Sequence, residues 1–550
     1  MLSISIVINT LNRANLLQKT LESFRGLDYS GEFEVIVVNG PSTDQTAQII
    51  DSWIPQIRAG SCDVANLSVS RNIGICMASG DIVAFIDDDA IPEPEWLTQL
   101  AGAYDRAEVA AAGGMVFDPS GCTYQYQYST ANRLGNANWA SKSSTEHLCF
   151  PGSYEFPYLQ GTNASFRRSV LLEVGGFDEE IEFYLDETEL CCRIVDAGYV
   201  IRQLPNAYVH HKFAPSHVRD ENKITRYRYP VLKNKIYFSL KHARPYFKLE
   251  DILEDNRNFI QGHANEVEAF ISMGRLPETE RGRFEDESKR AWERGNERGL
   301  SCRPEMISNE KLARCDGSFV RFISDLRIDR KSIVVISRDF PPFQSKGLAT
   351  GTKDFAEALA ETGNIVHVIT QSPDINRVDF ESGVWVHRVL PRDIPLSPSA
   401  LERLVPIRIW NWSATALEEC RRISSHRSVD VVQAPLWECE GIAFLLEGDW
   451  PLVTSLNATL RSWMSSNPNQ SGDLEWMSNF GLPMLALEKD LMTSVDAIRA
   501  ENETVTREIE SAYDFKFDRS RTDIVSHGTS EAERSLSLYD LAVQRHRNAL

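Results

Sequence analysis

Several kinds of segment are missing from this 550-residue sequence. No apolar run approaches the roughly 18 residues needed to cross a bilayer. The ten cysteines contain no CxxC pair and no compact framework, which in a chain of this length is typical of reduced thiols. A strand-like run begins at residue 4, so we expect no signal peptide. These absences predict a cytoplasmic protein.

Positive charge is also in short supply. The chain carries 58 Lys and Arg against 78 Asp and Glu, a formal net charge of −20. Nucleic acids are bound through clustered cations, so this balance argues against a nucleic-acid partner. A phosphorylated substrate would need a local cation instead. The hydrophobic fraction of 42% is that of ordinary globular proteins, and the length predicts about three domains.

Residues 1–215 alternate short β-branched runs with helical patterns, and we expect the first domain to extend to residue 250 with helices that buttress it. Strands are predicted at 3–8, 33–38 and 81–86, and a helix at 16–24. This alternation is typical of an α/β, Rossmann-like fold with a mostly parallel sheet, in which ligands bind at the carboxyl ends of the strands. Asn39 and the acidic run after residue 86 both follow such ends.

The remainder divides into a charged helical region and a second α/β region. Residues 251–330 are so charged, above all at 276–300, that we expect a helical linker. The run 223–248, rich in basic and aromatic residues, fits a peripheral membrane or acceptor contact, or a helix packed on the first domain. From 331 to 550 the α/β rhythm restarts, which predicts a second Rossmann-like domain with strands at 333–336, 366–369, 429–432 and 452–454.

Three consecutive carboxylates, Asp87, Asp88 and Asp89, follow the apolar strand at 82–86. Like charges at close range raise each other's pKa unless a cation or several donors meet them. Oxygen ligands on a short loop suit Mg²⁺ or Mn²⁺ bound to phosphates. A bare acidic turn in solvent has the same sequence, so the rest of the domain decides between the two interpretations.

Further motifs occur in a fixed order along the first 215 residues. They are IVINTLNR (6–13), EVIVVNGPSTD (34–44), SRNIG (70–74), ASGD (78–81), DDD (87–89), GTNASFRR (161–168), GGFD (175–178), LDETEL (185–190) and AYVHH (207–211). In order and spacing, residues 1–215 resemble a family 2 glycosyltransferase of the GT-A fold. The resemblance implies an inverting transfer from a nucleotide-diphosphate sugar to a glycan or lipid-linked glycan acceptor.

The resemblance also implies roles for individual residues. The metal, Mn²⁺ or Mg²⁺, is expected on Asp89, Asp87 and His211. The nucleotide sugar is expected to contact Thr10, Arg13, Asn39, Arg71, Asp87, Asp88, Gly161 and Asn163. Asn39 replaces the aspartate that is usual in the family.

Glu187 and Asp186 occupy the position of the family's catalytic acid pair. The resemblance implies that Glu187 is the general base, with Asp186 as the competing candidate, since an acceptor hydroxyl needs a base within hydrogen-bond reach. Acids in the first turn of a helix also complement its dipole without any catalytic role.

The second α/β region resembles a different family. RDFPP (338–342), GLATGT (347–352), ALAETGNIVHVIT (358–370), GVWVHRV (383–389), DVVQAP (430–435) and IVSHG (524–528) follow in sequence. Residues 331–530 thus resemble the N-terminal, acceptor-side domain of a family 4 glycosyltransferase, which is half of a GT-B fold. Only 22 residues follow Gly528 (550 − 528), so we expect the donor domain to be missing and the uncovered face to allow self-association.

Two other classes of protein compete with this interpretation. A non-catalytic carbohydrate-binding or scaffold protein could retain the same folds, but the acids at 87–89 and 186–187 would be expected to be lost. A nucleotidyltransferase would carry a glycine-rich loop after the first strand, whereas residues 9–13 contain no glycine. The sequence therefore favours a glycosyltransferase, in a setting that by analogy is surface polysaccharide synthesis.

Overall fold

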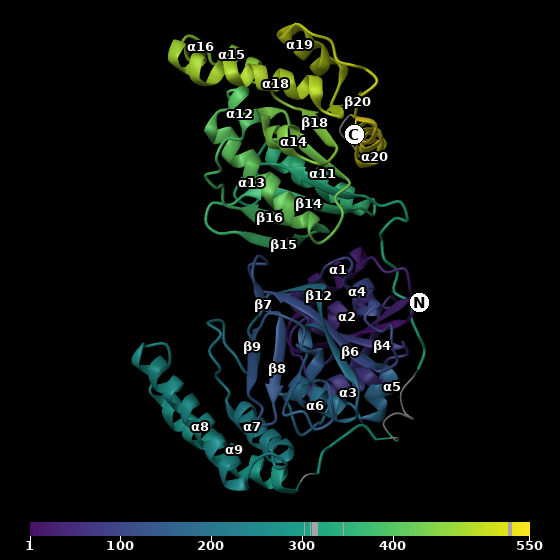
Figure 1. The fold of residues 1–550 in the computed structure, drawn as a ribbon, viewed down its shortest axis with the longest axis vertical. Helices are drawn as coiled ribbons and strands as arrows, with labels where there is room; N and C mark the ends of the chain where they lie inside the picture. Colours follow the sequence, from purple (N-terminus) through teal and green to yellow (C-terminus); the bar gives the residue numbers. More distant parts are fainter. Residues whose placement is uncertain (302, 309, 311–316, 345, 526–530, 550) are drawn as a thin grey trace. The chain divides into compact units, whose positions relative to one another are not determined.

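The computed structural model describes residues 1–301, 303–308, 310, 317–344, 346–525 and 531–549. The chain forms two compact units, Met1–Ser324 (unit 1) and Asp325–Leu550 (unit 2) (Figure 1). The sequence predicts a linker at 251–330 between two domains. In the structure most of that region instead belongs to unit 1, for the reason given below.

Unit 1 is built on a nine-stranded mixed sheet of order β3-β2-β1-β4-β11-β6-β12-β5, with β7 paired to β6. Its strands are β1 (Ile4–Thr10), β2 (Phe33–Asn39), β3 (Arg58–Ser61), β4 (Ile82–Phe85), β5 (Ala90–Pro92), β6 (Val109–Phe117), β7 (Tyr124–Tyr126), β11 (Ala164–Arg167) and β12 (Val200–His211). The strands β1 to β4 are parallel, as predicted. Their carboxyl ends therefore meet at one edge of the sheet.

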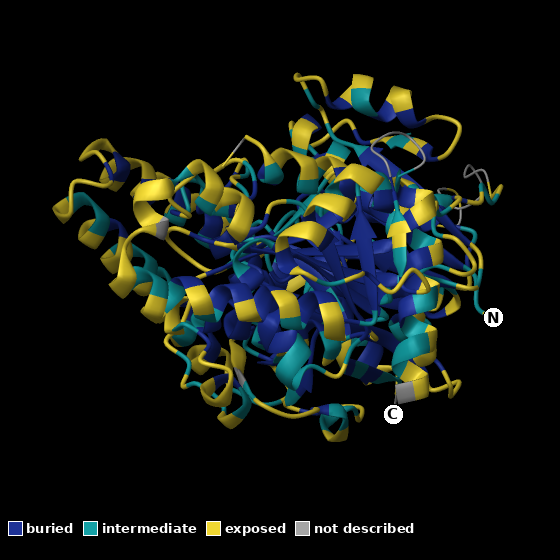
Figure 2. Cartoon of the chain, turned by 90° about the horizontal axis from the view of Figure 1, so that it is seen from above, coloured by how far each residue is buried: buried dark blue, intermediate teal, exposed yellow. Residues whose placement is uncertain are grey.

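Helices cover both faces of this sheet. They are α1 (Ala14–Ser23), α2 (Thr46–Trp53), α3 (Leu67–Met77), α4 (Trp96–Gly102), α5 (Arg168–Glu173) and α6 (Asp186–Asp196). Alternate residues of β1 point to opposite faces, so Ile6 packs with α1, α2 and α4, whereas Val7 packs with α3, α5 and α6. Burial on both faces explains why these strands read as continuous apolar runs. For the chain as a whole, Figure 2 shows buried strands in the interior and helices with exposed outer sides around them.

A separate antiparallel sheet of order β10-β8-β9 is inserted between β7 and β11. It consists of β8 (Tyr128–Asn132), β9 (Ala137–Ser141) and β10 (Glu155–Pro157). Short 3₁₀ turns lie at Phe24–Gly26, Glu146–Leu148 and Gly161–Asn163. The last of these turns joins the small sheet to β11.

In the described part of unit 1, the helices after β12 are α7 (Tyr229–His242), α8 (Leu249–Ser272) and α9 (Thr279–Ser301). The helix α9 packs closely on α7, because a Cβ at Gly295 would lie 2.8 Å from Ile236 and a Cβ at Gly299 would lie 2.7 Å from Leu240. The two glycines thus allow α9 to pack closely on α7. The charged composition of α9 gives no indication of this packing. This contact is the physical reason why residues predicted as a linker lie in unit 1.

The basic residues of α7 are buried and paired. Lys233 lies 2.7 Å from Glu182, and Lys235 lies 2.5 Å from Asp255. Buried and neutralised in this way, the two ammonium groups are not available to anionic lipids. The alternative of a helix packed on the first domain therefore describes α7, and these lysines do not support the membrane contact.

Unit 2 contains an eight-stranded sheet of order β15-β16-β14-β13-β17-β18-β19-β20, parallel except for the pair β15–β16. Its strands are β13 (Ser332–Ile336), β14 (Ile365–Gln371), β15 (Arg377–Glu381), β16 (Val384–Val389), β17 (Val431–Pro435), β18 (Leu452–Leu456), β19 (Ala497–Ala500) and β20 (Thr522–Ile524). The predicted strands are present. Parallel sheets of this kind occur in many α/β proteins, so the resemblance to family 4 stays a prediction.

The helices of unit 2 surround this sheet. They are α11 (Leu348–Glu361), α12 (Pro398–Glu402), α13 (Ile407–Ser424), α14 (Ile442–Glu447), α15 (Leu460–Ser466), α16 (Pro468–Ser471), α17 (Leu474–Trp476), α18 (Leu482–Ser494), α19 (Glu503–Tyr513) and α20 (Glu531–Ala549), with irregular turns at Trp437–Cys439 and Met477–Gly481. Of the segment 524–528 that carries part of the family 4 resemblance, residues 526–528 lie outside the described residues.

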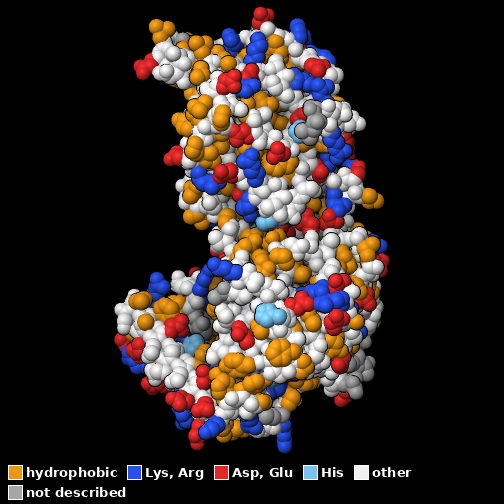
Figure 3. Space-filling view, in the orientation of Figure 1, with side chains coloured by type: hydrophobic (Ala, Val, Ile, Leu, Met, Phe, Trp, Pro, Cys, Tyr) orange, Lys and Arg blue, Asp and Glu red, His pale blue; other side chains and the backbone are white. Residues whose placement is uncertain are grey.

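The described residues also bear on the expectations about membrane-spanning segments and cysteines. None of their helices is both long enough and apolar enough to cross a membrane. The eight cysteines within these ranges are free thiols. On the face drawn in Figure 3, positive and negative side chains are interspersed.

Candidate functional site

One cavity of about 530 Å³ lies at the carboxyl ends of β1, β2 and β4. Segments far apart in the sequence meet there. Of the predicted site residues, those that line it are Thr10, Arg13, Arg71, Asp87, Asp88, Asp89, Gly161, Asp186, Glu187 and His211. The parallel strands bring these segments to one edge, as the sequence analysis expected.

Asp87, Asp89 and His211 form a compact cluster in this cavity. One ligand atom from each lies within 4.8 Å of the others. His211 Nε2 is 3.3 Å from Asp89 Oδ1 and 3.6 Å from Asp87 Oδ2. The pairing of β12 with β5 sets this geometry, because it places His211 opposite Ala90, the residue after Asp89.

The cluster fits a divalent cation. Asp89 Oδ1 is buried and accepts no well-formed hydrogen bond, and its near neighbours are the charged or ligating groups Arg13 Nη1 at 3.4 Å and His211 Nε2 at 3.3 Å. His211 Nδ1 lies 3.0 Å from the Gln125 side-chain oxygen, and donating that hydrogen bond would leave the Nε2 lone pair for a metal. Carboxylate oxygens with one imidazole suit Mn²⁺ or Mg²⁺.

The three carboxylates differ in electrostatic environment. Burial raises the pKa of Asp88 to about 6, although Arg13 opposes the shift. Burial would also raise the pKa of Asp89, but His211, Arg13 and the Ala214 amide outweigh it and hold this pKa at about 2. Asp89 is thus the ionised acid at the centre of the cluster.

Arg13 is engaged with the acids and with the chain that follows β12. Its Nη1 lies 2.7 Å from Asp88 Oδ1, and its Nη2 donates to the Pro215 carbonyl at 2.6 Å. The Ala214 amide in turn donates to Asp89 Oδ2 at 2.6 Å. The segment after β12 is therefore connected to the acidic run both through Arg13 and directly through Asp89.

Asn39 ends β2 beside Thr10 in the parallel register. Its Oδ1 accepts a hydrogen bond of 2.7 Å from Ser42, and the neighbouring Gly40 lines the cavity. Asn39 thus shapes the turn at the rim of the cavity.

Glu187 and Asp186 open α6 and are both held by Arg71 from α3. Arg71 Nη2 lies 3.0 Å from Glu187 Oε1, and Nη1 pairs with Asp186. Burial would raise the pKa of Glu187, but Arg71 and a hydrogen bond from Asp186 bring it below the ordinary value. Burial and the Glu187 charge raise the pKa of Asp186 well above its ordinary value. Glu187 is therefore the ionised member of the pair.

The backbone before α6 is strained. Tyr184 and Leu185 have φ angles of 70° and 68°, a region that non-glycine residues rarely adopt. Such conformations cost on the order of 1–3 kcal/mol each and cluster at functional sites. They turn the chain into α6, whose first residues line the cavity.

Gly161 has a steric role. A Cβ built at this residue would lie 2.0 Å from Glu187 Oε1 and 2.2 Å from Arg71 Nη2. Only glycine therefore allows the Arg71–Glu187 pair to pack against the turn at Gly161–Asn163.

Asn163, which the resemblance assigns to the nucleotide sugar, lies beside the cavity and forms hydrogen bonds within the protein. Its side chain is buried and donates to the Ala207 carbonyl at 2.9 Å, while its Oδ1 accepts from Trp96 Nε1 at 2.9 Å. It does not line the cavity. Both ends of the carboxamide form hydrogen bonds within the protein, and these bonds connect β12 to α4. This is a structural role.

Sequence reasoning missed an aromatic wall of the same cavity. Tyr126, Trp139, Tyr158 and Tyr184 line it, together with Phe213 and Arg219 from the segment after β12. The guanidinium of Arg219 lies 3.6 Å from the centre of the Phe213 ring. The alternation of tyrosines at 124, 126 and 128 is the one signal that could have indicated this wall.

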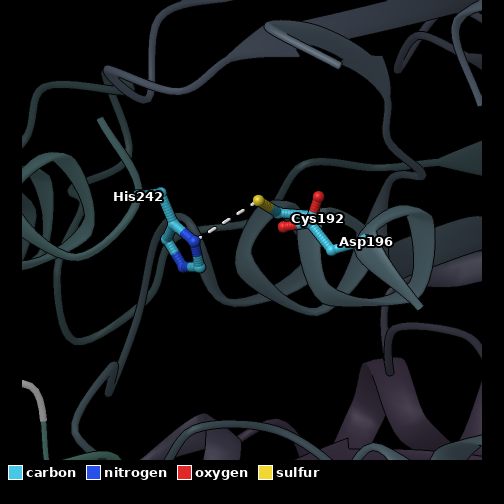
Figure 4. Close-up of side chains that lie close together, drawn as sticks. All are labelled: Cys192, Asp196 and His242. Carbon is cyan, nitrogen blue, oxygen red and sulfur yellow. Dashed lines mark hydrogen bonds between the residues drawn. The ribbon is translucent and has the colours of Figure 1, made fainter. Parts of the chain in front are cut away.

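A second cluster of potential ligands, Cys192, Asp196 and His242, lies outside the cavity (Figure 4). Cys192 Sγ and His242 Nδ1 are 3.5 Å apart. Arg133 Nη1 donates to Cys192 Sγ at 3.0 Å and to Asp196 at 2.6 Å, so a guanidinium already supplies the cation. Burial also raises the pKa of the Cys192 thiol far above its ordinary value. This cluster therefore fastens α6 to its neighbours.

Comparison with known proteins identifies the class. Residues 5–175 match the family described as Glycosyl transferase family 2. This match supports the predicted resemblance to family 2 glycosyltransferases over residues 5–175. The match ends before the second unit begins.

Curated relatives match the same part of the chain to different extents. Glucosyl-dolichyl phosphate glucuronosyltransferase of Haloferax volcanii is 28% identical over 224 residues, 38% of this chain and 69% of the relative. Pre-mycofactocin glycosyltransferase of Mycobacterium tuberculosis is 27% identical over 225 residues, 38% of this chain and 42% of the relative. Uncharacterized protein y4gI of Sinorhizobium fredii is 26% identical over 247 residues, 41% of this chain and 26% of the relative. The chain thus spans between 26% and 69% of the length of these relatives.

Among solved structures, the mannosyltransferase PcManGT from Pyrobaculum calidifontis, in complex with GDP-Man and Mn²⁺, is 17% identical. The likeness covers 54% of this chain and 87% of that chain, with a TM-score of 0.33. The ligands in that complex belong to that protein.

Proposed function

We propose that unit 1 transfers a sugar from a nucleotide-diphosphate donor to a hydroxyl of a glycan or lipid-linked glycan, with inversion at the anomeric carbon. One observation supports this proposal above all others. A single cavity contains both a cation-binding cluster, Asp87, Asp89 and His211, and an ionised acid, Glu187, fixed by Arg71. A donor diphosphate and an acceptor hydroxyl could therefore be bound side by side.

The donor side of the cavity contains Thr10, Gly40, Asp88 and the metal cluster. Mn²⁺ or Mg²⁺ held by Asp87, Asp89 and His211 would neutralise the charge that develops on the leaving diphosphate. Arg13 holds Asp88 in place and, through the Pro215 carbonyl, the segment after β12. These contacts order the donor side before substrate binds.

The acceptor side is governed by Glu187. The acceptor oxygen forms a bond to the anomeric carbon as the bond from that carbon to the diphosphate oxygen breaks. The acceptor proton passes to Glu187, whose lowered pKa keeps it ionised and able to accept. Arg71 orients the carboxylate, and Gly161 leaves room for the pair. Attack from the face opposite the leaving group gives inversion.

Two further assignments belong to this proposal. The name of the Haloferax volcanii relative includes a lipid-linked sugar, which supports a lipid-linked acceptor here. We place the reaction in the cytoplasm, in surface polysaccharide synthesis, with contact to the membrane supplied by such an acceptor. We assign unit 2 to the acceptor-side half of a GT-B fold, without donor binding and with a face that allows self-association.

A donor screen tests the proposal. The full chain is incubated with Mn²⁺ and a panel of UDP-, GDP- and dTDP-sugars, and release of the nucleoside diphosphate and the melting temperature are measured. One donor should be hydrolysed and, at 100 times its Kd, should stabilise the chain by about 2.7 kcal/mol.

Asp89→Ala is the matched variant, because it removes the buried carboxylate of the metal cluster. It should abolish the Mn²⁺-dependent response to the donor. Full turnover by this variant in the presence of EDTA would show that the metal assignment is wrong.

A further inference from the structure

Trp139 is an exposed aromatic residue that lines the functional cavity. Its relative exposure is 59%, although large apolar side chains are normally buried. It lies on β9, at the edge of the small sheet β10-β8-β9. The strands β8 and β9 are drawn beside the main sheet in Figure 1. An exposed indole in a cavity is a candidate contact for a ligand.

The indole is held in one orientation by two tyrosines. Its Nε1 donates to the Tyr158 hydroxyl at 2.6 Å, which satisfies its one polar group. The Tyr126 ring meets it edge to face, with centroids 6.1 Å apart. The π surface left exposed is therefore rigid and loses little conformational entropy when a ligand covers it.

The position of the indole relates it to Glu187. Tyr158 precedes Gly161 by three residues, and Gly161 touches Glu187. A chain segment of that length spans at most roughly 10 Å. Burial raises the pKa of both Tyr126 and Tyr158, and the Glu187 charge adds to both shifts. Trp139 and the proposed base thus line the same cavity and are connected through Tyr158 and the short segment that ends at Gly161.

The chemistry of the wall indicates an uncharged, ring-shaped ligand. A pyranose presents a face of C–H groups that packs on the electron-rich face of an indole. Its hydroxyls could exchange hydrogen bonds with Tyr158 and with Gln160, which also lines the cavity.

We propose that Trp139 is the platform on which the acceptor sugar stacks, so that it determines acceptor affinity and specificity. This inference rests on the proposed function, since it assigns the substrate class of the acceptor side. Trp139 is a specificity-determining residue, and the donor side does not depend on it.

Two variants and one control test the platform in the full chain. Trp139→Ala removes the ring, and Trp139→Phe restores an aromatic surface without the hydrogen bond to Tyr158. Phe150→Ala is the control, because Phe150 is 51% exposed but does not line the cavity. The probes are methyl mono- and disaccharides, which carry no aromatic group of their own.

In the kinetic assay, Trp139→Ala should raise the KM for the methyl glycoside on the order of tenfold, as expected for loss of an aromatic surface that the bound ligand covers. Donor hydrolysis without acceptor should stay within about twofold. Trp139→Phe should recover most of the loss, and Phe150→Ala should behave like the unmodified chain. An unchanged KM in Trp139→Ala would overturn the proposal.

Saturation-transfer NMR with the same methyl disaccharides gives a readout independent of turnover. The ring C–H protons should be saturated by the unmodified chain and by Phe150→Ala, but not by Trp139→Ala. Equal saturation in Trp139→Ala, or none in the unmodified chain, would refute the platform. Failure of the proposed function is distinguishable, because it would appear as absent donor hydrolysis in the unmodified chain.

Discussion

Arg71 is the residue on which both candidate acids depend. It is almost fully buried, and its guanidinium lies over the Phe177 ring at 5.1 Å and the Phe85 ring at 5.8 Å. A buried cation is tolerated when carboxylates and aromatic faces surround it. Arg71 therefore holds the acids, and its expected contact with the nucleotide sugar stays a prediction.

Exchange of the two acids for amides separates their roles. Glu187→Gln should lower the transfer rate by about 10²–10⁴-fold, the usual loss when a general base is removed. Donor-induced thermal stabilisation should persist, because Glu187 lies on the acceptor side. Asp186→Asn should lose less activity, since burial and the Glu187 charge raise the pKa of Asp186 and so favour its protonated form, which cannot accept a proton. The reverse ranking of the two rates would assign the base to Asp186.

Gly161→Ala should disturb the pair without touching either acid. The added methyl would overlap Glu187 and Arg71, and such overpacking costs about 1–3 kcal/mol. Transfer should fall while the circular dichroism spectrum stays unchanged. Gly262→Ala on α8 is the control, because a Cβ there meets open space and should stabilise the helix by roughly 0.5–1 kcal/mol. Normal transfer by Gly161→Ala would show that Arg71 and Glu187 can move apart freely.

Sequence reasoning located most of the site residues because they sit in short motifs at strand ends. The Asp87–Asp89–His211 cluster is an example, since strand pairing brings its members together. Asn163 and Trp139 could not be placed in this way. The direction of a side chain in a turn, or its exposure on an inserted hairpin, depends on tertiary contacts that no local pattern encodes.

At the scale of elements, α6 and α7 are joined by buried charges. Glu189 on α6 is fully buried, and Lys241 of α7 donates to it at 2.8 Å. Arg193 and His242 contact the same carboxylate. Burial would raise the pKa of Glu189, but the charges of Arg193 and Lys241 and a hydrogen bond with His242 bring it well below the ordinary value. Because α6 carries Glu187, this network also positions the site.

Glu189→Gln should therefore destabilise unit 1 by about 3–5 kcal/mol, the cost of leaving buried partners unpaired. The native pKa is depressed, so the stabilisation is present above the ordinary glutamate pKa and is lost as pH falls through the lower native value. Urea unfolding of the full chain at pH 7 and pH 4 should thus show a smaller difference at pH 4. The exposed Glu254→Gln on α8 should change stability by less than about 0.5 kcal/mol. An equal difference at both pH values would contradict this account.

The region predicted as a linker shows why the packing of helices could not be predicted from the sequence. Charged residues dominate α9, and that composition is typical of a solvated helix. The contact with α7 depends on Gly295 and Gly299, which contribute no hydrophobic signal. Helix existence was thus predictable, whereas helix packing was not.

At the scale of the whole molecule, the boundary between the units follows Phe322. This ring is 2% exposed and stacks on Phe33 at 5.5 Å and on Trp53 at 6.3 Å. The Phe322 amide also donates to the Phe33 carbonyl at 2.8 Å. The chain after α9 therefore returns to the first strands of unit 1 before unit 2 begins.

Shortened chains test which of the two units binds and hydrolyses the donor. Residues 1–324 should retain donor hydrolysis, whereas a chain that ends between 276 and 299 should unfold more readily because it exposes the face of α7 that α9 covers. Residues 325–550 should bind no nucleotide sugar in a calorimetric titration. Saturable binding by that fragment would contradict the view that unit 2 is catalytically incomplete.

The late position of Phe322 has a consequence for synthesis on the ribosome. Trp53 emerges 269 residues before the ring that covers it (322 − 53). At about 5–20 residues per second, that interval lasts roughly 13–54 seconds. Throughout that time Phe33 and Trp53 present an uncovered aromatic surface on the nascent chain. Translation speed and chaperone access in this interval should thus decide how much newly made chain reaches the native state.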